Sequence, residues 1–513
     1  MSGTNRRSIE IAPGLITDDT SFRVGQGGYV DISNMRPWNG SMQTIGGWEA
    51  LSSDTLTGTC RGIHSWRDSS GDLNIAFGTN SKLLLWKGGD LFDITPTDLV
   101  TGLVDGTGGR GFGTGAFSTG NFSEPSTGDF FPLTWSLDNF GDNLIANARG
   151  QKIWRWQNDT SVVAAIIPNA PTQVNFIAVT SSRQIVAYGC NEEVGDAFNP
   201  RCIRFCDIED PEDWTTSTTN NAGEFILRNA GTLLSARHLG DGQLVLTDEG
   251  AFYQQFVGSE STTFRFTRIG TNCGIIGPRA VSVLGQRAMW MSPDARFWTV
   301  TVGGAPQRVP GPLEREIGDN LATVQDAKIY AGTVSEFGEI WWFYPDSRDG
   351  NENSRYVAYS VPIAQAGGNP WFAGVLDRTA WHDASPSPHV IGADPDGNIY
   401  WHERGRSANG GMINWHAETG DIALSDGTRA LQVRGMWPDF EDQQGPINVS
   451  VITRFDQRGV KQTHGPFAVL PTTSQVPFRA TGNIMSLRFE GAAGPTFGRL
   501  GKLTYDATAR GRR

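Results

Sequence analysis

A pattern of apolar and polar positions recurs along the chain and predicts β-hairpins. Residues 243–258 read as the apolar arm QLVLT, the polar turn DEG and the aromatic arm AFYQQFVG. Two such arms around a polar turn are typical of a hairpin, in which we expect Gly250 to take positive φ. The pattern returns at roughly fifty-residue intervals, a period found in propeller repeats. It covers residues 74–88, 143–156, 184–207, 287–300, 339–361 and 389–403.

Several hairpin arms are apolar at consecutive positions rather than at alternate ones. Examples are LLLW from Leu83 and IWWFY from Ile340. Both faces of such strands have to be covered, which stacked propeller blades do, whereas a two-layer sandwich leaves one face of each strand in water. The sequence therefore predicts an all-β protein: a β-propeller of about six to eight blades, with an N-terminal β segment and a small C-terminal β-domain.

The strongest turn signal runs from Asp394 to Gly397. Pro395 presets φ near −65°, and Gly397 stands where a positive φ is needed. Together with Asp396 and Glu403 this segment resembles a calcium loop, but its glycine and its third acidic position do not match the EF-hand spacing. Turn formation accounts for these carboxylates without a metal.

Two other turns carry structural residues. Asn39-Gly40 between two short runs of strand-forming residues is a two-residue hairpin signal. Asp210-Pro211 begins a second turn, and we expect Trp214 behind it to anchor the loop on its blade rather than to bind a ligand.

The hairpin pattern also predicts how the chain is divided. Residues 1–60 precede the first hairpin and are expected to close the propeller ring or to dock, residues 61–427 form the propeller, and residues 428–513 form a C-terminal β-unit. Helices are rare, and the clearest candidate is residues 312–321.

Residues 101–128 are rich in Gly, Ser and Thr and predict a long surface loop. Its GTGGRGFG run lacks the strand-to-helix context of a phosphate-binding loop. Because a glycine-dense loop can order on contact, this loop, with Gly106, Arg110 and Gly120, is a candidate docking site.

Composition and charge narrow the functional classes. The formal net charge is −12 and no block of Lys and Arg occurs, so tight DNA binding is not expected. Five cysteines without a Cys-x-x-Cys pair indicate small buried side chains in a reducing compartment. No apolar run is long enough for a membrane span, so we expect a soluble chain made in the cytoplasm.

No combination of residues indicates catalysis. The three Trp-His pairs at Trp381, Trp401 and Trp415 predict buried tryptophans and surface histidines, because neighbouring strand residues point to opposite faces. Nothing selects a carboxylate pair for glycoside hydrolysis, and no nucleophile elbow or zinc-protease motif is present. We expect no catalytic, cofactor-binding or metal-binding residues.

Several phrases of the sequence resemble the tail-nozzle proteins of short-tailed bacteriophages, also described as packaged-DNA stabilisation or tail-tube proteins. The resemblance is spread over most of the chain, in the order expected. The phrases are NMRPWNG with IGGW (34–48), FCDIEDPEDW (205–214), LTDEGAFY (246–253), FRF with CGIIGP (264–278), WMSPD (290–294) and the ending from Leu500.

The resemblance implies a structural virion protein that is not an enzyme. It implies a homo-oligomeric ring, expected to be six subunits, below the portal and its adaptor ring in the virion tail. The ring would retain packaged DNA and let it pass without specific binding, and it would meet tail fibre, spike or needle proteins. Assembly would take place in the cytoplasm of the host bacterium.

Two alternatives remain open at the level of sequence. One is a carbohydrate-binding or carbohydrate-cleaving propeller, which predicts exposed Trp or Tyr platforms. The other is a cytoplasmic scaffold propeller with a ligand at its axial funnel.

Overall fold

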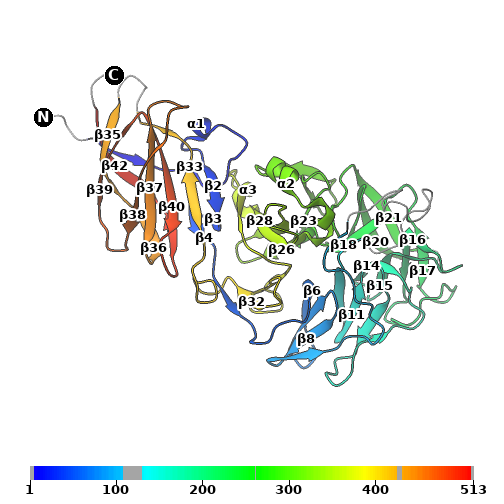
Figure 1. Ribbon diagram of the computed structural model, residues 1–513. Helices are drawn as coiled ribbons and strands as arrows, with labels where there is room; N and C mark the ends of the chain where they lie inside the picture. Colours follow the sequence, from blue (N-terminus) through cyan, green and yellow to red (C-terminus); the bar gives the residue numbers. More distant parts are fainter. Residues whose placement is uncertain (1–4, 108–129, 260–261, 425–429, 510–513) are drawn as a thin grey trace, which may run out of the picture.

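The computed structural model describes residues 5–107, 130–259, 262–424 and 430–509 (Figure 1). Within these residues, seven four-stranded antiparallel sheets follow one another along the chain. The inner strand of each sheet contacts the inner strand of the next, and the seventh contacts the first. The chain therefore forms a closed seven-bladed β-propeller, which confirms the predicted all-β propeller class.

Each blade runs from an inner strand at the axis to an outer strand at the rim. In that direction, blade 1 consists of β6 (Cys60–Arg67), β7 (Leu73–Thr79), β8 (Leu83–Lys87) and β9 (Asp90–Asp93), and blade 2 of β10 (Trp135–Phe140), β11 (Asn143–Ala148), β12 (Ile153–Trp156) and β13 (Ala165–Ile166). Blade 3 consists of β14 (Val174–Val179), β15 (Ile185–Asn191), β16 (Phe198–Phe205) and β17 (Gly223–Ile226). Blade 4 consists of β18 (Leu233–Leu239), β19 (Gly242–Thr247), β20 (Gly250–Ser259) and β21 (Thr262–Thr271). Blade 5 consists of β22 (Val281–Leu284), β23 (Arg287–Met291), β24 (Phe297–Thr301) and β25 (Gln307–Val309). Blade 6 consists of β26 (Tyr330–Val334), β27 (Glu339–Pro345), β28 (Asn353–Ser360) and β29 (Trp371–Val375). Blade 7 consists of β30 (Ala380–His382), β31 (Val390–Ala393), β32 (Ile399–His402) and β5 (Trp48–Ala50).

Each hairpin expected from the sequence is the central pair of strands of one blade. β7–β8, β11–β12, β15–β16, β19–β20, β23–β24, β27–β28 and β31–β32 are these pairs. Every residue of β15 and β27 is buried, because each blade is covered by a neighbour on both faces. This explains why apolar residues occupy consecutive positions in these strands.

The outer strand of blade 7 comes from the other end of the chain. β5 pairs with β32 in antiparallel register, and Trp48 lies opposite His402. β30, β31 and β32 supply the other three strands, so the ring is closed by hydrogen bonds between segments that are far apart in the sequence. Such closure leaves blade 7 without an open edge at β32.

The second domain is built from both ends of the chain, beside blade 6 (Figure 1). It has three sheets, in the strand orders β1-β42-β35-β39, β2-β33-β40-β37-β38 (β34 also pairs with β40) and β3-β4-β41-β36. The strands are β1 (Asn5–Ile9), β2 (Tyr29–Ser33), β3 (Met35–Trp38), β4 (Ser41–Thr44), β33 (His416–Thr419), β34 (Ile422–Ala423), β35 (Leu431–Trp437), β36 (Phe440–Gln444), β37 (Ile447–Arg454), β38 (Gln462–Val469), β39 (Val476–Gly482), β40 (Ile484–Gly491), β41 (Phe497–Leu500) and β42 (Leu503–Ala509).

This pairing divides the chain differently from the expected 1–60, 61–427 and 428–513. β1–β4 belong to the C-terminal unit, which begins at β33, and of the strands before β6 only β5 belongs to the propeller. The reason is long-range hydrogen bonding: β2 pairs with β33, most of the chain away, and a local pattern carries no trace of that partner.

Helices are short. They are α1 (Ser21–Val24), α2 (Glu314–Asn320), α3 (Val361–Gln365) and the 3-10 helix η1 (Thr323–Lys328). α2 lies within the predicted helix at 312–321, and Leu313, Ile317 and Leu321 are buried along one face. Within the described ranges, no helix combines the length and apolar character needed to cross a membrane.

Candidate functional site

The joint between the two domains contains a buried group of charges. Arg36 of β3 is fully buried and forms ion pairs with Glu339 of β27, at 3.4 Å, and with Glu403 behind β32. The Arg36 guanidinium also lies 3.9 Å from the centroid of the Phe337 ring. One side chain of the second domain therefore binds blades 6 and 7 together.

Backbone contacts extend the joint on both sides of Arg36. The Asn34 side chain donates hydrogen bonds to the carbonyls of Val375 and Asn414, at 3.1 and 2.8 Å. Further along, Gly47 donates to the carbonyl of Gly405 and accepts from Arg404, both at 3.0 Å. Residues 34–48 thus run from the second domain through the joint into the closing strand of blade 7.

Burial and nearby charges perturb Glu339. Burial raises the pKa of the Glu339 carboxyl, and so does the nearby charge of Glu403. The Arg36 guanidinium and a hydrogen bond from Trp341 lower it. The net effect is a rise of the pKa from 4.5 to about 7. Because the folded pKa exceeds the unfolded one, the stability linked to Glu339 is fully present below about pH 4.5. It is lost as the pH rises through 7.

We expect the Glu339→Gln variant to gain stability relative to the wild type between pH 5 and pH 8. The expected gain is about 1–3 kcal/mol, because glutamine does not ionise in the buried site. Urea denaturation of both proteins at the two pH values measures it, with Glu336→Gln, an exposed neighbour, as the control. If the difference in the free energy of unfolding between the wild type and Glu339→Gln does not change with pH, Glu339 does not titrate in this range.

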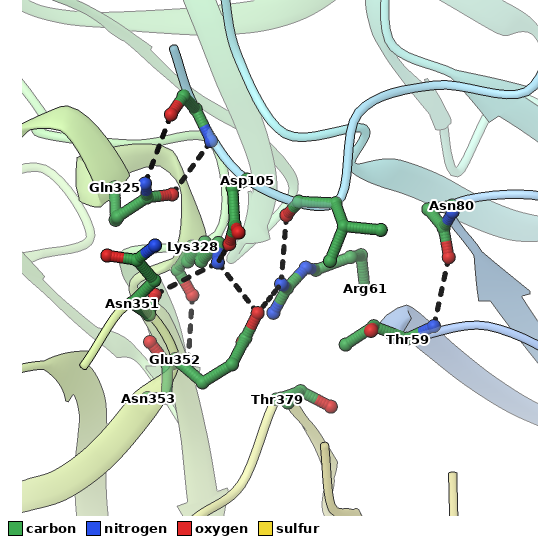
Figure 2. A network of polar contacts seen from close by, with 12 residues as sticks. Thr59, Arg61, Asn80, Asp105, Gln325, Lys328, Asn351, Glu352, Asn353 and Thr379 are labelled. Carbon is green, nitrogen blue, oxygen red and sulfur yellow. Dashed lines mark hydrogen bonds and ion pairs between the residues drawn. The ribbon is translucent and has the colours of Figure 1, made fainter. Parts of the chain in front are cut away.

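A second polar network holds the base of the glycine-rich loop (Figure 2). The ammonium group of Lys328 is fully buried and contacts Asp105 at 2.5 Å and Glu352 at 2.6 Å. Arg61 of β6 donates to the same Glu352 oxygen at 2.6 Å. The Gln325 side chain donates to the Gly106 carbonyl and accepts from its N–H, at 3.1 and 2.8 Å.

The two ends of this loop meet in a short stem. Leu103 forms a parallel bridge with Pro132, and Thr107 donates to the carbonyl of Phe130 at 3.1 Å. Gly106 therefore belongs to a fixed stem between blades rather than to a free loop. Arg110 and Gly120 lie outside the described residues.

An axial cavity of about 300 Å³ lies where the seven inner strands converge. Its wall carries two arginines, three histidines and two aspartates, together with apolar residues of the inner strands. The charged and imidazole side chains are Arg237, Arg279, His64, His238, His382, Asp138 and Asp383. The cavity is far too small to admit a DNA duplex.

Of the histidines in the Trp-His pairs, His402 corrects the expectation of a surface position, whereas the His416 side chain is 26% exposed. Trp381, Trp401 and Trp415 are buried as expected, but His402 is only 2% exposed and accepts a hydrogen bond from Arg378 Nε at 2.8 Å. Neighbouring residues do point to opposite faces, yet in a stacked blade both faces are covered. His382 lies in the wall of the axial cavity.

The turn residues predicted from the sequence lie at turns, with one difference. Asn39 and Gly40 have φ of 46° and 79° between β3 and β4, and Gly397 has φ of 84° between β31 and β32, next to Pro395. Gly250 does not take positive φ, contrary to expectation, because it already lies in β20. Its lack of a side chain matters instead because a Cβ would lie 2.6 Å from the Gly270 carbonyl oxygen.

The loop at Asp210 is held by its own residues. Asp210 accepts a hydrogen bond from the Glu212 N–H at 3.0 Å, and the Trp214 indole donates to the Pro211 carbonyl at 2.8 Å. Trp214 is 1% exposed and packs in the core between blades 2 and 3. Its position is that of an anchor.

The sequence did not single out Arg36, Lys328, Arg237 or Arg279. Each is one basic residue among apolar or neutral neighbours, and the partners of Arg36 and Arg279 come from segments more than 100 positions away. The only local signal is a charged residue inside a run expected to be a buried strand, as in MRPW around Arg36. All five cysteines are buried and unpaired.

No family model matches the chain, and no curated protein matches it. Solved structures similar to it include the computationally designed protein Ika8, with 8% identity and a TM-score of 0.36, covering 69% of this chain and 100% of that one. PorZ, an essential surface component of the type-IX secretion system of Porphyromonas gingivalis, has 8% identity and a TM-score of 0.37, covering 84% and 46%. The WD40 β-propeller domain of Doa1 has 12% identity and a TM-score of 0.40, covering 69% and 97%.

Structural similarity at these TM-scores carries no argument about this protein, so its fold is defined by its own strand pairing. By its pairing, the chain is a seven-bladed β-propeller joined to a second β-domain.

Proposed function

We propose that this protein is a structural subunit of the tail nozzle of a short-tailed bacteriophage. In this role, about six copies form a ring below the portal and its adaptor, and DNA leaves through the axis of the ring. The subunit performs no catalysis, and its outer loops meet fibre, spike or needle proteins.

The observation that carries the proposal is the position of residues 34–48. This phrase resembles the nozzle proteins, and it forms the joint that fixes the propeller to the second domain through Arg36. A subunit of a ring that bears load needs its domains held in one arrangement, which a buried joint with many hydrogen bonds supports.

The axial cavity supports a DNA path between subunits rather than through one. The cavity of about 300 Å³ is enclosed by side chains of all seven inner strands. A duplex passing this protein therefore needs a channel made by several copies, which agrees with a ring.

Exposed apolar side chains on the outer strand of blade 3 are a candidate contact between copies. They are Phe225 and Ile226, which are 42% and 38% exposed. β17, which carries Phe225 and Ile226, is the last strand of its sheet. Exposed apolar side chains along an open strand edge are typical of protein interfaces.

Electron microscopy of the tagged protein, purified from phage particles, tests the proposal. We expect a ring of about six subunits with an axial channel, located beneath the connector of a short tail. A second preparation, in which a short Gly-Ser linker replaces residues 108–129 between Thr107 and Phe130, should give a folded monomer that assembles poorly. A same-length Gly-Ser replacement is the matched control for loop length.

The outcomes separate the alternatives. A monomeric propeller that is absent from any particle contradicts the nozzle role and directs the next test to glycan arrays. Normal assembly of the shortened variant would leave the ring in place but reject the loop as a docking site. Unfolding of that variant would reject the assignment of residues 108–129 as a dispensable loop.

A further inference from the structure

The axial cavity has the size and lining of a small-molecule site. Its volume of about 300 Å³ is at the lower end of the range for ligand pockets. Residues of all seven inner strands line it. Its function is not explained by ring assembly.

Two guanidinium groups in this wall have no acidic partner. Within the described residues, neither Arg237 nor Arg279 forms an ion pair with a carboxylate. Arg237 donates to the carbonyl of Ala236 at 3.2 Å, and Arg279 Nε donates to the carbonyl of Trp135 at 2.7 Å. Both guanidiniums lie near the Phe176 ring, at 5.1 and 5.6 Å from its centroid. Arg279 Nη2 donates to the same Trp135 carbonyl, so among the described residues Nη1 of Arg279 and both Nε and Nη2 of Arg237 have no hydrogen-bond partner.

The two carboxylates in the wall are occupied by neutral donors. Asp138 accepts hydrogen bonds from the N–H groups of Asn139 and Val179, at 2.9 and 2.8 Å. Asp383 accepts from the N–H of Ala384 at 2.7 Å and from the hydroxyl of Thr333 at 2.6 Å. These contacts fix the positions of both carboxylates in the wall, and neither forms an ion pair with Arg237 or Arg279 among the described residues.

The arginine pair has no carboxylate in direct contact among the described residues, although Asp138 acts on Arg237 from across the cavity wall. Burial and the nearby Arg279 lower the pKa of Arg237 to about 9. His382 adds no charge at neutral pH, because burial and the neighbouring His64 lower its pKa to about 4. Its Nε2 accepts from the Ser65 N–H at 3.2 Å, and its Nδ1 lies 2.9 Å from the Asp383 carbonyl. Burial also lowers the pKa of His64.

We propose that the axial cavity binds a small oxyanion between Arg237 and Arg279. The ligand is either inorganic phosphate or a small carboxylic acid, since guanidinium groups bind both kinds of oxygen in a forked geometry. This site is independent of the proposed nozzle role and of the number of subunits.

Isothermal titration of the full-length protein with inorganic phosphate, and separately with succinate, tests this proposal at constant ionic strength. We expect saturable one-to-one binding of at least one of the two anions. Arg237→Gln should weaken it roughly tenfold or more, because a charged hydrogen-bond donor is lost. Arg201→Gln, an exposed arginine of β16, is the matched control and should bind as the wild type does.

Stability gives a second readout. Without anion, the melting temperature of Arg237→Gln should be no lower than that of the wild type, because the substitution removes a charge that has no ion-pair partner. With anion, only the wild type and Arg201→Gln should gain in melting temperature. If the Gln variant does not fold, Arg237→Lys replaces it, and loss of the forked geometry should weaken binding roughly tenfold.

Each outcome decides the proposal. Binding of phosphate alone, or of succinate alone, supports it and identifies the source of the oxyanion. No binding of either anion to the wild type overturns it. Binding that survives both changes at Arg237 places the anion elsewhere and also overturns it.

Discussion

Arg36→Met is expected to lower the free energy of unfolding by about 3–5 kcal/mol, because it breaks a buried ion pair. Methionine keeps most of the buried volume but leaves Glu339 and Glu403 without their cation in a site closed to water. Urea denaturation followed by tryptophan fluorescence measures the loss. Because the protein has two domains, the unfolding transition of each should be fitted separately.

Arg404→Met is the matched control for Arg36→Met. Arg404 is close in sequence to the same joint, but its side chain is 47% exposed and pairs with Glu49 at 2.9 Å. A surface pair of this kind contributes about 1 kcal/mol or less. Equal losses in the two variants would show that the buried charges do not hold the joint.

Trp135→Ala is expected to cost about 3–5 kcal/mol, because it leaves a cavity between blades 1 and 2. The Trp135 indole is 1% exposed, and its Nε1 donates to the Thr79 carbonyl at 2.7 Å. The indole lies directly on Gly78, where a Cβ would be 2.2 Å from Trp135 Cγ. Gly78→Ala alone should therefore cost about 1–3 kcal/mol by overpacking.

The double variant Gly78→Ala/Trp135→Ala tests this contact. Once the indole is removed, the added methyl group has space, so Gly78→Ala should cost much less in that background than in the wild type. Thermal unfolding of the four proteins gives the coupling energy. Additive losses, within about 0.5 kcal/mol, would contradict the direct contact.

The same arrangement joins blades 6 and 7. A Cβ at Gly332 would lie 2.1 Å from Trp381 Cδ1, and the Trp381 indole donates to the Thr333 carbonyl at 3.0 Å. A tryptophan from one inner strand thus packs on a glycine of the neighbouring blade at two places in the ring. Rigid, close-packed contacts of this type fix the angle between blades.

The fold could be predicted where the local pattern carries the constraint. The central strands of each blade are covered on both faces, and their consecutive apolar residues, as in Ile340–Tyr344, record that directly. Some strands are too short for a pattern to be recognised: the inner strand β30 has three residues and the outer strand β13 has two. The exact number of blades could not be predicted either, because it is defined by the contacts between inner strands, which are distant in the sequence.

The candidate sites could not be predicted in the same way. Arg36 meets its carboxylates more than 300 positions further along the chain, and Arg279 meets the Trp135 carbonyl 144 positions away. Neither partner leaves a signal next to the arginine. Turn residues are different, because the constraint on Asn39-Gly40 or Gly397 is the backbone conformation of that residue itself.

The closure of blade 7 by β5 sets the order in which the chain can fold. Trp48 pairs with His402, about 350 residues later, which corresponds to on the order of 20 to 70 s of ribosomal synthesis. During that time β1, β2 and β5 have no strand partners, and the ring stays open at blade 7. The propeller can close once β32 has been made, whereas the second domain can be completed only after the chain has passed β42, so the N-terminal segment can find its propeller partner before its last partner in the second domain.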